Sequence, residues 1–594
     1  GGTYTYMAHI DKREYAYWLD QSGNNNDWTS NGLTESDIMV DSPTNSFATL
    51  NPLARDGDVS VREGNLKALQ AGVQHDAISG TMAPTTGKWY FEACLAQAEA
   101  NVFIGLITTN NRITGNTYDA VGSWYLNTGA STYNNGTESN ASLTAVPTGG
   151  IVQVAYDLDN SKIWFGVNNT WILSGDPASA ANPVYTNLSG TVIAAGSFYQ
   201  AELGATFNFG ADSSFAGLKT PQGKQDGNDI GDFAYTPPAG FLSLCTKNLP
   251  EPDVIPGEHF NTVLYTGDGS AQDITTVGFQ PDWVWIKNRS AADSHQVFDS
   301  VRGVTNAMHI DTTAQEAAND DTLTHFLSNG FTTGDDDVTN TNSESYVAWN
   351  WKAGTAFSND ASSTSVGSID SAGSVNTDAG FSVIGYTGTG TTGTVAHGLA
   401  GVPEMYIVKN RDAVDNWATY FEVLGNDKRV ALDSTAIIQD TNNWDSTSPT
   451  STVFTVKGGE NRVNDSNEKY ISYHFRSIDG YSRVGNYTGG GNVDTFVYTG
   501  FRPAFVLIKN TNEAGEGFVI MNNKSDPSNV VGTYLTAYGN TAEQGTALTT
   551  STRSIDILSN GFKIIGNSTE INEDDTEHVF LALAETPFKY SNGR

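Results

Sequence analysis

The sequence predicts an all-β protein, and three observations support this fold class. Apolar and polar residues alternate over short runs bounded by turn-forming residues, as expected of half-buried strands. Glycine is abundant, with 61 residues. Runs with the periodicity of an amphipathic helix are scarce. Because 594 residues exceed what one hydrophobic core organises, we expect several β domains in the chain.

Charge and cysteine content exclude several classes of function. The 31 basic and 66 acidic residues leave a net charge of -35, which opposes binding to nucleic acids and to anionic membranes. Cys94 and Cys245 are the only cysteines, so no disulfide framework is expected. No apolar run reaches the length of about 20 residues that a membrane helix needs. We therefore expect neither nucleic-acid partners nor membrane insertion.

Residues 41–250 contain an ordered series of predicted strands. In GKWYFEACLA (87–96) apolar residues alternate, and in GGIVQVAYDLDNSKIWFGVNNTW (149–171) two alternating runs flank a turn at 159–161. The order and spacing of five short motifs resemble the SPRY domain, a bent β-sandwich of the concanavalin-like class: 87–92, 104–106, 156–159, 163–166 and 207–210. The resemblance implies a binding or scaffolding domain, because SPRY domains generally recognise proteins through loops at one end of the sandwich.

The segment 112–142 is the candidate ligand or partner loop of this domain. It carries Tyr118, Trp124, Tyr125 and Tyr133 among small polar residues. Exposed aromatic rings could stack on sugars or anchor a protein partner. The alternative, which we favour, is that these rings pack the loop onto its own sandwich.

Three internal repeats follow the predicted sandwich. One phrase occurs as GFQPDWVWIKNRS (278–290), GLAGVPEMYIVKNRD (398–412) and GFRPAFVLIKNTN (500–512). A second aligns without gaps as SESYVAWNW (343–351), NEKYISYHF (467–475) and DTEHVFLAL (575–583). The first and third repeats also share LSNGF, whereas the corresponding turn of the second has diverged.

Alignment of the repeats assigns their tryptophans to the core. Four tryptophans of the first repeat align with apolar or aromatic residues in the other copies, and both faces of the first phrase are apolar, as in a central strand between two layers. The predicted core residues of the repeats are Trp283, Trp285, Trp349, Trp351 and Phe505. The Lys-Asn pair that ends the phrase is interpreted as a strand exit, with the lysine stem on the core and its ammonium in water.

These observations predict an N-terminal attachment segment (1–40), a SPRY-like β-sandwich (41–250) and three repeated β-sandwich modules in a linear array. The modules are expected at 251–355, 381–480 and 481–594, with a Gly/Ser/Asp-rich linker at 356–380.

No catalytic motif is present in the sequence, so we expect a protein without enzymatic activity and without a cofactor. One acidic cluster, Asp335, Asp336 and Asp337, has the hard oxygen donors that Ca²⁺ prefers. It lacks the ligand spacing of an EF-hand loop. A solvated acidic turn is therefore the favoured interpretation.

The SPRY-like region followed by these repeats resembles structural proteins of tailed bacteriophages, particularly marine ones. The resemblance implies a virion protein assembled in the bacterial cytoplasm, namely a tail fibre or another appendage for host attachment. Its partners would be other virion proteins and a host-surface glycan or protein. We expect a homo-oligomer and hypothesise that it is a trimer. Two alternatives stay open: a capsid decoration or other structural virion protein that binds neighbouring chains, and a glycan-binding or glycan-degrading surface protein.

Overall fold

The protein is described from a computed structural model, which covers residues 24, 26, 29, 40–42, 44–97, 101–440, 442–546 and 552–591. The chain forms two compact units, Gly1–Pro250 and Glu251–Arg594, and each is described by itself. The attachment segment expected at 1–40 lies almost entirely outside the described residues.

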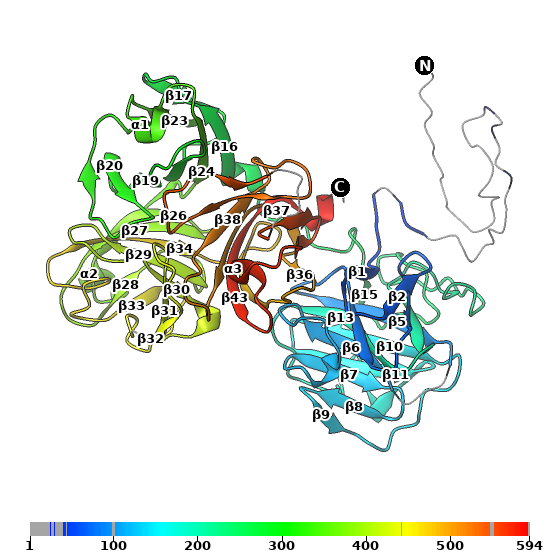
Figure 1. Ribbon diagram of the computed structural model, residues 1–594. Helices are drawn as coiled ribbons and strands as arrows, with labels where there is room; N and C mark the ends of the chain where they lie inside the picture. Colours follow the sequence, from blue (N-terminus) through cyan, green and yellow to red (C-terminus); the bar gives the residue numbers. More distant parts are fainter. Residues whose placement is uncertain are drawn as a thin grey trace. The chain divides into compact units, whose positions relative to one another are not determined.

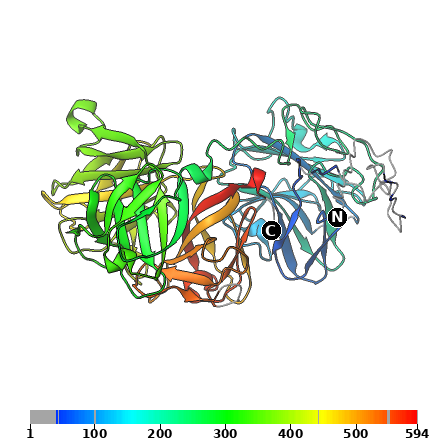
Figure 2. The same cartoon turned by 90° about the horizontal axis from the view of Figure 1, so that it is seen from above.

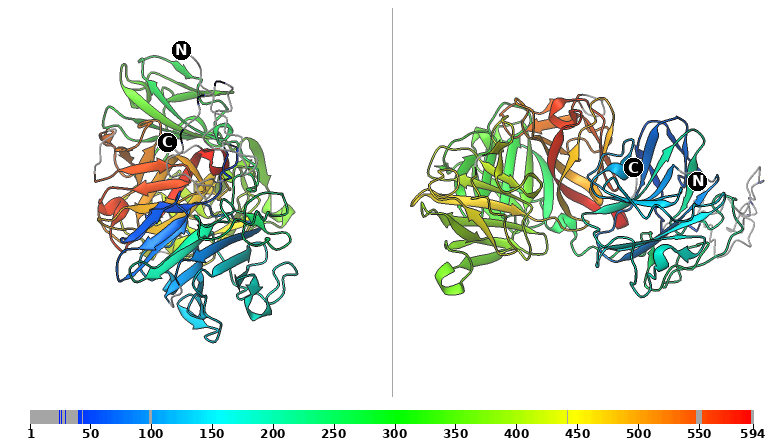
Figure 3. Two further views of the ribbon diagram at one scale, coloured as in Figure 1. Left: turned by 90° about the vertical axis from the view of Figure 1, so that its right-hand side faces the viewer. Right: turned by 90° about the horizontal axis from the view of Figure 1, so that it is seen from below.

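The first unit contains a sandwich of two antiparallel sheets, which we call the N-terminal sandwich (Figure 3). The first sheet has the order β1 (Leu50–Arg55), β4 (His75–Gly80), β13 (Val192–Tyr199), β6 (Val102–Thr108), β7 (Ser123–Asn127), β8 (Ser131–Asn134), β9 (Thr137–Ser139). The second sheet has the order β12 (Thr170–Trp171), β11 (Lys162–Val167), β10 (Ile151–Asp157), β5 (Lys88–Leu95), β14 (Gly204–Asn208), β3 (Lys67–Gln70), β2 (Val59–Arg62). The short β15 (Leu242–Ser243) pairs in parallel with β5.

Aromatic rings fill the space between these sheets. Phe91 on β5 stacks on Phe207 of β14, with ring centroids 6.2 Å apart. Gly196 on β13 faces this layer, and a Cβ there would lie 3.0 Å from the Phe207 ring. Glycine at this position therefore lets the two sheets approach closely.

The second unit contains the three repeats, which we call modules 1, 2 and 3 (Figure 1). Module 1 has a large sheet, β16 (Phe260–Thr266), β24 (Ser345–Trp351), β18 (Trp283–Asn288), β19 (Gln296–Asp299), β20 (Gly303–His309), β21 (Ala317–Ala318), and a small sheet, β17 (Gln272–Ile274), β23 (Gly330–Thr333), β22 (Leu323–Leu327). Module 3 repeats this order as β35 (Ser482–Thr488), β43 (Glu577–Pro587), β37 (Phe501–Asn510), β38 (Val519–Asn522), β39 (Thr533–Thr536), β40 (Gln544–Gly545), with β36 (Thr495–Tyr498), β42 (Gly561–Ile564), β41 (Ile555–Leu558).

Module 2 differs from the other two at both sheets. Its large sheet has the order β25 (Thr355–Asn359), β26 (Ser371–Asn376), β27 (Phe381–Thr387), β34 (Lys469–Phe475), β29 (Met405–Asn410), β30 (Ala418–Phe421), β31 (Lys428–Ala431), β32 (Gln439–Asp440). Its small sheet is β28 (Gly393–Ala396) with β33 (Val453–Val456). In modules 1 and 3, LSNGF begins at the last residue of β22 and β41, respectively. Module 2, where this sequence has diverged, has no counterpart of these strands among its described residues.

Helices are short in both units. The described ones are η2 (Thr117–Asp119), η3 (Ile172–Ser174), η4 (Pro256–Glu258), α1 (Asp337–Asn340), α2 (Ala361–Thr364), η5 (Glu422–Leu424), α3 (Thr569–Asn572) and η6 (Phe588–Tyr590). None of the helices in the described part of the chain is long and apolar enough to cross a membrane. The all-β fold class is confirmed.

Each module buries both faces of its large sheet. On β18, Val284 and Ile286 point into the core between the two sheets of module 1. Trp283 and Trp285, on the opposite face, join a second core that also contains residues of modules 2 and 3. The same alternation places Met405 of module 2 in this common core, which we call the shared core.

The three modules are therefore one compact unit and do not form the expected linear array. Figures 1 and 2 show the green, yellow and orange-red sheets of the three modules packed together. The physical reason is the apolar character of both faces of each central strand. One face is covered by the small sheet of its own module, and the other requires the neighbouring modules.

The segment 356–380 is not the linker that its composition predicted. Residues 355–359 and 371–376 form β25 and β26, which extend the large sheet of module 2 beyond β27. The edge strand β25 is mostly exposed, which suits its polar composition, whereas β26 lies between β25 and β27 and buries half of its residues. Module 2 therefore begins earlier than residue 381, the start expected for it from the sequence.

Equivalent backbone hydrogen bonds join the modules in a closed cycle. In each case the acceptor is the backbone carbonyl oxygen of the residue that follows a Lys-Asn pair. The donor is a backbone N–H of the next module, in the residue just before the last strand of its large sheet. The three bonds are Glu543 N to Arg289 O (2.9 Å), Glu316 N to Arg411 O (3.0 Å) and Ile438 N to Thr511 O (2.8 Å). The unit thus has cyclic internal pseudo-symmetry, in the order module 1, module 3, module 2.

Candidate functional site

The predicted core aromatics of the repeats lie in the shared core. Trp283 stacks on Trp351, with centroids 4.3 Å apart, and on Tyr473 of module 2, at 4.5 Å. Trp349 and Trp351 each make an edge contact with Phe505 of module 3. These rings are buried and pack against one another, so no ring face is free to stack on a sugar.

The Lys-Asn pairs are buried as well, which differs from the exposed ammonium that we expected. Each lysine Nζ donates to the carbonyl oxygen of the adjacent asparagine: Lys287 to Asn288, Lys409 to Asn410 and Lys509 to Asn510. Each asparagine Oδ1 accepts two backbone N–H groups of the following turn. Burial lowers the pKa of each lysine to about 8. The pair therefore fastens the strand exit to its own turn.

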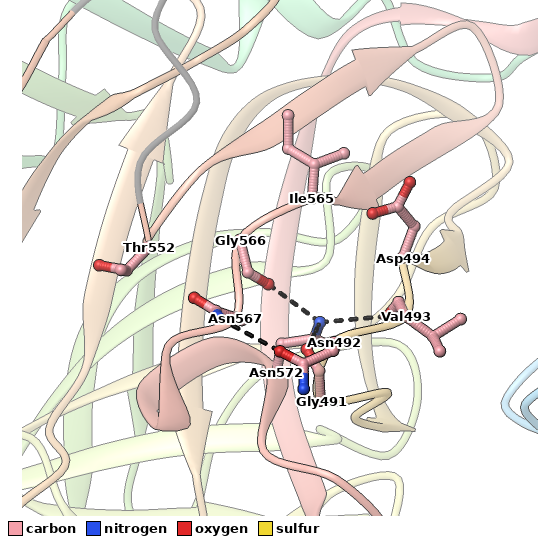
Figure 4. A pocket seen from close by; sticks show the side chains of 9 residues that line it. All are labelled: Gly491, Asn492, Val493, Asp494, Thr552, Ile565, Gly566, Asn567 and Asn572. Carbon is pink, nitrogen blue, oxygen red and sulfur yellow. Dashed lines mark hydrogen bonds between the residues drawn. The ribbon is translucent and has the colours of Figure 1, made fainter.

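A second asparagine recurs in all three modules, although the alignment of the repeats did not identify it. Asn572 ends α3, and its side chain donates to the carbonyl oxygens of Gly491, Val493 and Gly566 and accepts from Gly490 N (Figure 4). Asn340 and Asn464 make corresponding bonds in modules 1 and 2. The signal in the sequence is the asparagine itself in DVTN and EIN, but the surrounding residues differ too much between copies to align.

A polar pocket of about 480 Å³ surrounds Asn572 in module 3. Figure 4 shows that the Asn572 amide points at the backbone that lines this pocket. The hydrogen-bonding groups of the Asn572 side chain are thus used within the fold. We assign this pocket a structural role.

In the N-terminal sandwich, the predicted loop 112–142 contains the three strands β7, β8 and β9 and the short helix η2. Trp124 and Tyr125 lie on β7 and are 1% and 0% exposed. Trp124 Nε1 donates to Asn187 Oδ1, and Tyr125 OH donates to Thr117 Oγ1. Both rings are therefore core residues, because alternate positions of β7 face either the sandwich interior or the covering segment that contains η2.

Tyr118 and Tyr133 are half-buried and belong to an aromatic cluster on the outer face of the first sheet. Tyr118 stacks on Phe103 of β6, with centroids 3.9 Å apart and planes at 6°, and meets Tyr133 edge-on at 5.3 Å. His75 of β4 lies 4.5 Å from Tyr199, its cross-strand partner on β13. We call these five residues the aromatic patch.

Sequence reasoning missed three members of the aromatic patch. Phe103 falls in a run that read only as a strand, and His75 and Tyr199 stand more than 100 positions apart in the sequence. Antiparallel pairing of β4 with β13 brings these two side chains together. The pattern of one strand cannot reveal its partner.

The electrostatic surroundings of the aromatic patch are acidic. Desolvation lowers the pKa of His75, and the nearby carboxylates Asp119 and Asp76 oppose this shift. Tyr199 remains 40% exposed, and His75 Nδ1 is buried without a hydrogen-bond partner. The patch therefore presents partly exposed ring faces beside the exposed carboxylate of Asp119.

Two other carboxylates, Glu92 and Asp336, accept hydrogen bonds from groups of their own unit. Glu92, buried in the N-terminal sandwich, accepts from Ala234 N, Tyr235 N and Tyr90 OH, and desolvation raises its pKa to about 7. Asp336, in the candidate calcium cluster, accepts from Val338 N at the start of α1 and from Asn319 Nδ2. Within the described ranges, no three His, Cys, Asp or Glu residues are grouped so that they could hold a metal ion.

The fold thus defines an all-β protein with a two-sheet sandwich and a three-module unit. Residues 255–587 match the family of domains of unknown function DUF7483, and the chain belongs to this family. The match spans all three modules, in agreement with the single compact unit. No curated protein matches the chain.

Among solved structures, the chain is similar to SPRY domains. The SPRY domain of human HERC1 is 13% identical, with a TM-score of 0.21, and the match covers 27% of this chain and 97% of that one. The PSpry domain of TRIM65 is 12% identical, with a TM-score of 0.22, over 27% of this chain and 92% of that one. A human SPRY domain is 10% identical, with a TM-score of 0.21, over 25% and 94%.

Proposed function

We propose that this protein is a non-enzymatic structural protein of a tailed-bacteriophage virion, and that it attaches to host cells through its N-terminal sandwich. The observation that carries the attachment role is the aromatic patch. Partly exposed rings with a polar rim are typical of surfaces that bind proteins or sugars. The sequence resemblance to SPRY domains and to phage structural proteins supports the same role.

The composition of the aromatic patch defines the kind of receptor. Tyrosine and histidine rings supply apolar faces, while the exposed carboxylate of Asp119 accepts hydrogen bonds. A host-surface glycan or a protein surface rich in hydroxyl, amide or amine donors fits this chemistry. The three-module unit would serve as the rigid base that joins this surface to other virion proteins.

Binding to cells tests this proposal. The fluorescently labelled protein is incubated with a panel of marine bacteria, both intact and stripped of surface glycan. We expect binding to at least one intact strain, and about tenfold weaker binding by Tyr199→Ala, since a partly exposed anchor ring is lost. Leu173→Ala, which removes an exposed apolar side chain outside the aromatic patch, is the matched control.

The outcomes separate the alternatives. Loss of binding to stripped cells identifies a glycan receptor, and retained binding identifies a protein. Equal binding by Tyr199→Ala and the unsubstituted protein on every strain contradicts attachment through the aromatic patch. Gold labelling of phage particles places the protein on the tail or on the head, and labelling of the head alone favours the capsid-decoration alternative.

A further inference from the structure

We propose that the second unit carries a separate binding site for a neutral oligosaccharide, in a groove along the extended sheet of module 2. The groove has a volume of about 870 Å³ and is lined by residues of β25, β26 and β27 and by neighbouring loops. The side chains on which the proposal depends are Ser358, Asp370, Ala372, Thr387, Arg411 and Lys469.

The groove exists because the sheet of module 2 is extended. In modules 1 and 3, the strands equivalent to β27 are β16 and β35, and each is an edge strand. In module 2, β26 pairs with β27 from Ser371–Tyr386 to Asn376–Phe381, and β25 continues the sheet.

The floor of the groove is kept open by small residues. Gly385 on β27 faces Val301 of module 1, and a Cβ there would lie 3.4 Å from the Val301 side chain. Its cross-strand partner Ala372 is exposed on β26. Larger side chains at these two positions would fill the space between the two modules.

The lining carries balanced charge. Arg411 is held by Glu316 in a paired contact, with Nε to Oε2 at 3.0 Å and Nη2 to Oε1 at 2.8 Å. Asp370 is fixed by a hydrogen bond from Ala361 N at 2.9 Å, and Lys469 is exposed. Since acidic and basic groups face the same groove, neither a polyanion nor a polycation gains a net attraction there.

The remaining lining exposes polar and apolar atoms in similar proportion, and many of its polar groups are hydroxyls. The two rings that reach the groove, Tyr386 and Tyr470, are buried and stack on each other at 5.1 Å. Their hydroxyl groups donate to Val463 O and Asn461 O. The available contacts are hydrogen bonds from fixed donors and acceptors, which match the dense hydroxyl groups of a sugar chain.

Titration of the full-length protein with neutral oligosaccharides tests the site. The probes are glucan, mannan and galactan oligosaccharides, and binding is measured by calorimetry. Ala372→Trp fills the groove from an exposed position, and we expect at least about tenfold weaker binding. Ala356→Trp places the same side chain at an exposed position of β25 outside the lining, and we expect unchanged binding.

Three results would overturn the proposal: no heat of binding with any neutral oligosaccharide, equal binding by Ala372→Trp, or binding only of charged glycans or of an extended peptide along β25. Tyr199→Ala is measured in parallel. Because Tyr199 belongs to the other unit, the groove should bind these probes equally well in that variant, so failure of the attachment proposal and failure of this one are distinguishable.

Discussion

At the scale of single residues, buried polar side chains in this protein bind the backbone of their own module. The side-chain amide of Asn572 donates hydrogen bonds to turn carbonyl oxygens that would otherwise have no partner. Asn340 and Asn464 do the same in the other modules. A buried carbonyl without a partner costs more than an ordinary hydrogen bond contributes. Conserving this contact in three copies therefore preserves the turn that joins the two sheets.

Replacement of Asn572 by alanine should lower the free energy of unfolding by about 3 kcal/mol, because more than one buried carbonyl oxygen would lose its donor. Urea unfolding followed by tryptophan fluorescence measures the change. Asn567→Ala is the control, since Asn567 is exposed and makes one bond of 3.3 Å. A loss no larger than that of the control would contradict the structural role of Asn572.

The three buried lysines predict a rise in stability at alkaline pH. Their folded pKa of about 8 lies below the ordinary value of 10.5, so between these values the unfolded chain binds more protons than the folded one. The free energy of unfolding should therefore rise from pH 8 towards pH 10, on the order of 1 kcal/mol per lysine.

Urea unfolding at several pH values between 7.5 and 9.5 checks this expectation, with the range kept below the tyrosine titration near pH 10. Lys409→Met should reduce the slope, whereas Lys469→Met removes an exposed lysine and should leave it unchanged. A free energy of unfolding that falls steadily over this range would show that the lysines do not titrate as described.

At the scale of elements, the ends of the large sheets determine how the modules meet. The Arg289 guanidinium of module 1 makes two bonds to Glu543 of module 3, at 3.0 and 2.6 Å, beside the backbone bond between the same residues. Arg411 and Glu316 form the equivalent pair between modules 2 and 1. Module 3 has Thr511 at this position, so the third interface keeps only the backbone bond of this contact.

A double-mutant cycle with Arg289→Ala and Glu543→Ala should give a coupling energy of about 1 kcal/mol, because the pair is bidentate and mostly buried. The Lys563–Asp494 pair, whose aspartate is 48% exposed, is the control and should couple more weakly. Equal coupling in the two cycles would mean that the pair between modules adds nothing beyond a surface ion pair.

At the scale of the whole molecule, the shared core makes the three modules one cooperative unit. Trp349 of module 1 contacts Phe505 of module 3, and Trp283 contacts Tyr473 of module 2. Damage to one module therefore exposes surfaces of the other two. The N-terminal sandwich has its own aromatic interior and belongs to the other compact unit.

Trp349→Ala should destabilise all three modules together, by about 3–5 kcal/mol, through the cavity that it leaves. Hydrogen exchange measured by mass spectrometry should show reduced protection in peptides of modules 1, 2 and 3, with the sandwich peptides unchanged. Trp171→Ala, which alters a half-buried ring of the sandwich, should show the reverse. Reduced protection in module 1 alone would indicate independently folding modules.

The all-β class, the three copies and the burial of their tryptophans could be predicted from the sequence, because these features depend on local periodicity and on substitution between aligned copies. The columns that align Trp283 with Met405 and Phe505 already require an apolar environment on that face. Which residues cover that face becomes known only from the packing of the three modules. Periodicity reports that a face is buried, but it does not identify the partner.

The same limit explains the expectations that failed. Gly, Ser and Asp content suggested a linker at 356–380, yet pairing with β27 makes it part of a sheet. For Trp124 and Tyr125 the sequence left two alternatives, a binding loop or packing onto their own sandwich, and their burial on β7 agrees with the second, favoured one. The aromatic patch joins His75 and Tyr199 across two strands that are distant in sequence. Non-local pairing and the closure of three modules around one core depend on contacts that the order of residues does not display.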